Sequence, residues 1–137
     1  MAPHLRNSIK DSLHHRRLAV LRDVAASVIA MASYILAALC VGWVVSILLN
    51  PMGYVWHRFA IEAAISTTLG MMASWRLTNA LFPRRSGKVI FAAFAGVLLL
   101  VSLAGRSNAV NWLHTAQALL LVGLAYALFW PHRTRAR

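Results

Sequence analysis

The chain has 137 residues with 14 Lys or Arg and only 3 Asp or Glu, a formal net charge of +11, yet 60% of it is hydrophobic. Nucleic-acid-binding domains and disordered basic tails carry such a charge, but neither class is this apolar. Only 12% of the residues are charged, against about 25% in soluble domains. The composition therefore predicts a small integral membrane protein with basic ends, and no nucleic acid as partner.

Residues 1–23 predict a basic amphipathic helix that lies on the cytoplasmic leaflet. Leu5, Ile9 and Leu13 recur every four residues, which places them on one side of a helix. We expect Arg16 and Arg17 to contact anionic lipid headgroups, with docking to a specific partner as the alternative. The segment lacks the apolar core of a secretory signal peptide, while a mitochondrial presequence stays open.

Four apolar segments predict membrane-spanning helices. The first, third and fourth, residues 24–49, 89–105 and 109–130, are long enough to cross a bilayer core of about 30 Å. The second, residues 56–80, is interrupted by charges, so its length alone does not establish a span. With Arg58 and Arg76 assigned to the two ends of the second segment, Lys and Arg on the successive sides of the segments number five, one, four, one and three in chain order. This alternation predicts four spans.

The larger groups of cations then all fall on one side of the membrane, which is the cytoplasmic side. The expected fold is a compact four-helix bundle over residues 24–130, with both termini cytoplasmic and a basic tail at 131–137. The cytoplasmic membrane of a bacterium is the expected location. Arg84, Arg85 and Lys88 lie in the second connection, where we expect them to contact anionic headgroups.

Small residues favour close helix packing. Ser66, Gly70 and Ser74 follow Glu62 at four-residue intervals in the second segment, and Gly96 lies in the third. Small side chains let helix backbones approach closely within lipid. We expect packing inside the bundle, with a homodimer or partner-subunit face as the alternative.

Glu62 is the one carboxylate inside a predicted span, about a turn from its outer end. Such a residue faces a bundle interior, a partner or a water-filled cavity. Arg58 lies four residues earlier, so an ion pair between the two is available. Proton- or cation-coupled transport and contact with a partner are the alternatives to this pair.

His57 and His114 lie at similar depth near the outer ends of the second and fourth helices. We expect them to form interfacial hydrogen bonds, and no cofactor or metal is predicted. Haem ligation by both imidazoles, or a metal site completed by Glu62, is the less favoured alternative. Asn111 begins the fourth helix, where it is expected to hydrogen-bond between helices or to line an outer vestibule.

The run WRLTNALF, residues 75–82, ends the second helix. It resembles the GtrA-like translocases of polyprenyl-linked sugars, which close that helix with an Asn-Arg-x-x-Phe-like motif. Ala80 stands here where the motif has Arg. The resemblance implies translocation of a lipid-linked substrate as one alternative.

No nucleophile–base or paired-carboxylate pattern for catalysis is present in the sequence, so the chain is not expected to be an enzyme. We expect an accessory or assembly subunit of a larger membrane complex. The alternative is a small oligomeric transporter or flippase that uses Glu62.

Overall fold

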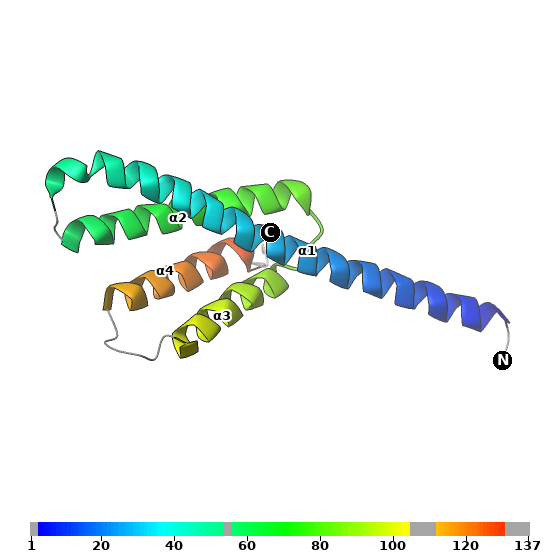
Figure 1. Cartoon of the computed structure of the whole chain (residues 1–137). Helices are drawn as coiled ribbons and strands as arrows, with labels where there is room; N and C mark the ends of the chain where they lie inside the picture. Colours follow the sequence, from blue (N-terminus) through cyan, green and yellow to red (C-terminus); the bar gives the residue numbers. More distant parts are fainter. Residues whose placement is uncertain (1–2, 54–55, 105–111, 131–137) are drawn as a thin grey trace, which may run out of the picture.

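The computed structural model describes residues 3–53, 56–104 and 112–130 (Figure 1). Over these ranges the chain is helical and contains no strand. The elements are α1 (Pro3–Leu48), the 3-10 helix η1 (Asn50–Met52), α2 (Trp56–Leu81), α3 (Gly87–Ala104) and α4 (Trp112–Phe129). The all-helical class and the four main helices are thus confirmed within the described residues.

Helix α1 joins the predicted arm and the first predicted span into one element. It is 46 residues long, or about 70 Å at 1.5 Å per residue. No Gly or Pro occurs between Pro3 and Gly42, so nothing interrupts the helix at the expected boundary after residue 23. Pro51 follows the end of α1, and Gly53 turns the chain with a φ of +72° that favours glycine.

Helices α1 and α2 form an antiparallel pair, and α3 and α4 form a second one beside it (Figure 1). Gly70 allows α1 and α2 to approach: a Cβ at this position would lie 3.0 Å from Cβ and 3.1 Å from N of Ala38. One helical turn further, the Ser74 hydroxyl donates a 2.6 Å hydrogen bond to the carbonyl oxygen of Ala30. The small residues of α2 therefore pack against α1 of the same chain.

The core lies where all four helices meet. Its buried apolar members are Ala26, Ala30, Met71, Ile90, Phe94, Leu121, Ala125 and Phe129. The Phe94 ring meets Tyr34 edge-on and stacks on Phe129, each with centroids 5.9 Å apart. These contacts connect α1, α3 and α4 through aromatic pairs that add to the apolar area they bury.

One described helical segment, Asp11–Leu48, is long and apolar enough to cross a membrane. The described parts of α3 and α4 that are apolar, Gly87–Val101 and His114–Phe129, are shorter. Helix α2 carries Arg58, Glu62 and Arg76, which lower its hydropathy. One candidate span is thus established by length and composition.

Gly70→Leu is expected to lower the free energy of unfolding by about 1–3 kcal/mol, because the new side chain meets the backbone of Ala38. Thermal unfolding of the purified protein in detergent, followed by circular dichroism, measures the effect. Gly96→Leu is the control: among residues 3–53, 56–104 and 112–130, no atom lies within 4 Å of a Cβ placed there, so a change within about 0.5 kcal/mol is expected. Equal losses in the two variants would contradict the packing described.

Candidate functional site

Arg58 of α2 reaches the C-terminal end of α1. Its Nη2 donates to the carbonyl oxygen of Ser46 at 2.9 Å and to the Ser46 hydroxyl at 3.1 Å. Carbonyls in the last turn of a helix lack partners inside the helix, and a cation there interacts favourably with the helix dipole. Arg58 therefore caps the C-terminus of α1.

Glu62 lies in the interface between α1 and α2. It is half-buried, and its Oε1 would lie 3.9 Å from a Cβ on Gly42, with Ser66 against the same glycine. The ion pair with Arg58 that the spacing makes available is not formed among the described residues, because Arg58 is engaged with Ser46. The carboxylate thus faces α1 at a point where Gly42 leaves space for it.

His57 and His114 are both exposed. Among the described residues, no three His, Cys, Asp or Glu side chains come together as a metal site would require. The alternative of a metal held by His57, His114 and Glu62 therefore gains no support. Asn111 lies outside the described residues.

Thr67 joins α2 to α4 at the middle of the bundle. It is 1% exposed and accepts a 3.3 Å hydrogen bond from Nε2 of Gln117 in α4. Buried hydroxyls need such partners, because an unpaired polar group costs about 1–3 kcal/mol. Thr67 was not among the residues predicted from the sequence, because the sequence does not show which helix faces a threonine in an apolar segment.

Asp23 of α1 caps the N-terminus of α3. Its Oδ1 accepts a 3.0 Å hydrogen bond from the backbone N–H of Ser86, the residue before α3. A carboxylate at a helix N-terminus satisfies an unpaired donor and interacts favourably with the dipole. Here the capping group comes from 63 residues away. Spacing along the sequence gives no signal for a contact over this separation, so Asp23 was not among the predicted site residues.

Arg85, in the loop between α2 and α3, contacts the ends of α2 and α4. Its Nη1 donates to the carbonyl oxygens of Phe82 at 3.1 Å and of Thr78 at 3.5 Å, and its guanidinium lies 5.5 Å from the centroid of the Phe129 ring. Burial lowers the pKa of Arg85, but an arginine remains charged at neutral pH. Arg85 thus acts in the fold as a C-terminal cap, turned toward the protein.

The five cations expected at headgroups now differ in their surroundings. Arg16, Arg17 and Arg84 are exposed, and the ammonium of Lys88 lies 5.3 Å from the centroid of the Trp130 ring. Gly87 lies so close to Phe129 that a Cβ at position 87 would overlap the carbonyl oxygen of Phe129. The start of α3 is therefore pressed against the end of α4, and the loop between α2 and α3 is a packed junction.

Asp23→Ala is expected to lower the free energy of unfolding by about 1 kcal/mol, because the N–H of Ser86 loses its acceptor. Asp23→Asn keeps a side-chain oxygen and is expected to lose less. Thermal unfolding in detergent compares the two variants. An equal loss in both would mean that the hydrogen bond does not stabilise the start of α3.

Comparison of the chain with family models, with curated proteins and with solved structures finds no match. The short resemblance of residues 75–82 to GtrA-like translocases thus has no further support.

Proposed function

We propose that this chain is a multi-pass protein of a bacterial cytoplasmic membrane, with four spans and both termini cytoplasmic. It serves there as an accessory or assembly subunit of a larger membrane complex. The observation that carries the membrane location is the distribution of side chains. Small polar residues occupy buried positions, whereas large aliphatic residues cover the outside of the described helices.

The buried polar members are Ser27, Ser66, Thr67, Ser74 and Thr78. On the outside of α1 alone, Ile35, Leu39 and Trp43 are 54%, 66% and 71% exposed. A soluble protein would leave this surface in contact with water, at a cost of about 25 cal/mol per Å². In a bilayer the same surface is favourable, and the interior polar groups hydrogen-bond between helices.

The low burial of α1 also supports a membrane location. Only 6% of the most apolar part of Asp11–Leu48 is buried within the chain, whereas a core helix of a soluble protein is mostly buried. Helix α2 is 26 residues long, or about 39 Å, which exceeds the bilayer core. Its charged ends, Arg58 and Arg76, then lie near opposite interfaces.

A topology reporter tests the four spans. An alkaline phosphatase fused after Arg137 is expected to be inactive, because it remains in the cytoplasm, whereas one fused after Gly53 is expected to be active outside. A green fluorescent protein at the same two positions gives the opposite pattern and serves as the control. Phosphatase activity after Arg137 would contradict the arrangement with both termini cytoplasmic.

The role as a subunit is supported by an outward pair of small residues on α3. Ala92 and Gly96 are spaced by four and both exposed, and within the part of the chain that the structure describes no atom lies within 4 Å of a Cβ placed on Gly96. In lipid, such a pair allows the backbone of another helix to approach closely. Gly70 uses the same property inside the chain, so Gly96 is free for a partner.

Transport through Glu62 is the second candidate. Its support is that Arg58 caps α1 and leaves the half-buried carboxylate in the interface between α1 and α2. A carboxylate in this position costs free energy and is commonly functional. A transporter would work as an oligomer in which this group binds and releases a proton or a cation.

Gly96→Leu and Glu62→Gln separate the two functions. As a subunit, the tagged Gly96→Leu protein is expected to recover about tenfold less of its co-purifying proteins from mild detergent. Glu62→Gln is expected to recover them unchanged. Val97→Leu, which alters an exposed neighbour that is already large, is the matched control. A protein that purifies alone, with pH-dependent transport lost in Glu62→Gln, would favour the transporter.

A further inference from the structure

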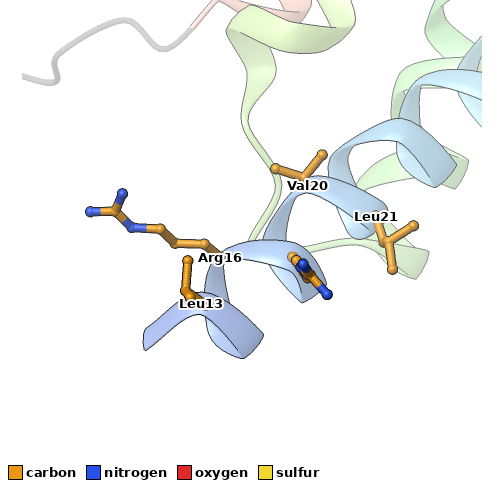
Figure 2. Close-up of a pocket in the computed structure, with 5 residues that line it drawn as sticks. Leu13, Arg16, Val20 and Leu21 are labelled. Carbon is orange, nitrogen blue, oxygen red and sulfur yellow. The ribbon is translucent and has the colours of Figure 1, made fainter. Parts of the chain in front are cut away.

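The N-terminal part of α1 carries an exposed apolar strip bordered by two arginines. We define the arm strip as Leu13, Val20, Leu21 and Val24, which are between 51% and 65% exposed. Spacings of three, four and seven residues place them on one side of the helix. Arg16 and Arg17 lie on the same side, and Figure 2 shows side chains of this surface projecting from α1. The two arginines, with Leu13, Val20 and Leu21, line a shallow apolar hollow.

The arm strip continues the surface of α1 that points away from the bundle. Ala26 and Ala30, on the other side of the helix, are fully buried, whereas Val28 and Ile35 are 60% and 54% exposed. In the membrane proposed above, on which this inference rests, Val28 and Ile35 contact lipid acyl chains. The helix face that contacts lipid at Val28 and Ile35 therefore continues beyond the end of the bundle, where the arm strip forms its exposed apolar surface.

The position of Asp23 shows how far the arm strip extends beyond the end of the bundle. Asp23 binds the loop before α3, so Leu13 lies ten residues, or about 15 Å, beyond the inner end of the bundle. Figure 1 shows α1 crossing the other helices obliquely. The arm therefore leaves the bundle at a slant, which keeps it nearer to the membrane surface than a helix that continued the bundle axis.

We propose that the arm strip lies in the headgroup region of an anionic cytoplasmic leaflet, with Arg16 and Arg17 at lipid phosphates. Apolar side chains bordered by cations are what such an interface binds. A second copy of the arm would bring these arginines against each other. Arg85 is turned onto Phe129, whereas Arg16 and Arg17, like Arg84 in the loop before α3, are exposed and can reach lipid phosphates.

A single-cysteine label tests this surface. Cys40, the one cysteine of the chain, is replaced by Ser, and an environment-sensitive dye is attached at Leu21→Cys. The full-length protein is placed in nanodiscs of phosphatidylcholine alone or mixed with phosphatidylglycerol. The dye is expected to be shielded from a water-soluble quencher in the anionic discs. A label at His15→Cys, on the opposite side of the helix, is expected to stay accessible.

Arg16→Gln with Arg17→Gln is expected to shift the shielded-to-accessible ratio at position 21 by about 30-fold toward accessible, since each cation near an anionic surface contributes about 1 kcal/mol and 1.4 kcal/mol is tenfold. Lysine at both positions keeps the charge and is expected to preserve the shielding. High salt is expected to weaken it.

A dye at position 21 that behaves alike in both lipids, whether shielded or accessible, overturns the proposal. Shielding that disappears when each disc holds one copy identifies a second copy as the occupant and also overturns it. A label at Leu39→Cys separates the two proposals, because it is expected to be shielded in every disc. If position 39 is accessible, the membrane location itself is wrong. If it is shielded while position 21 is accessible, only the arm proposal fails.

Discussion

The close approach of α1 and α2 is the contact on which the rest of the fold depends. With no side chain at Gly70, the backbone of Ala38 comes within van der Waals distance, and the Ser74 hydroxyl then reaches the carbonyl oxygen of Ala30. In the membrane location proposed above, association of helices would rely on such packing and hydrogen bonds, because apolar burial offers little gain in lipid. Helices α3 and α4 are placed relative to this pair.

The ends of the helices are held by charged side chains from other elements. Arg58 of α2 caps the end of α1, Asp23 of α1 caps the start of α3, and Arg85 caps the end of α2 while it contacts Phe129 of α4. Each contact satisfies backbone groups that a helix end leaves unpaired. From the sequence, Arg58 was expected in a salt bridge and Arg85 at lipid headgroups. In the structure both arginines hydrogen-bond carbonyl oxygens at helix ends.

Residues of the same type have different roles, because some pack within the chain and others remain exposed. Gly70 and Gly96 are equivalent in the sequence as small residues of apolar helices, yet one packs against Ala38, whereas a Cβ on the other would have no atom of the described residues within 4 Å. Likewise Arg85 is turned inward, whereas Arg16 and Arg17 remain exposed beside the arm strip. The surfaces proposed for a partner subunit and for lipid follow from this difference.

By itself, the sequence determined the helical class, the number of main helices and the approximate limits of α2, α3 and α4, because long apolar runs and their charged borders are local properties. It also identified Ser66, Gly70 and Ser74 as a packing stripe. The continuity of α1, the direction of Arg58 and the capping of α3 by Asp23 were decided only by the tertiary structure. For Arg58, the carboxylate of Glu62 four residues later competes with the carbonyl oxygen of Ser46 on another helix. Which of these groups binds the arginine depends on how the helix ends meet in space.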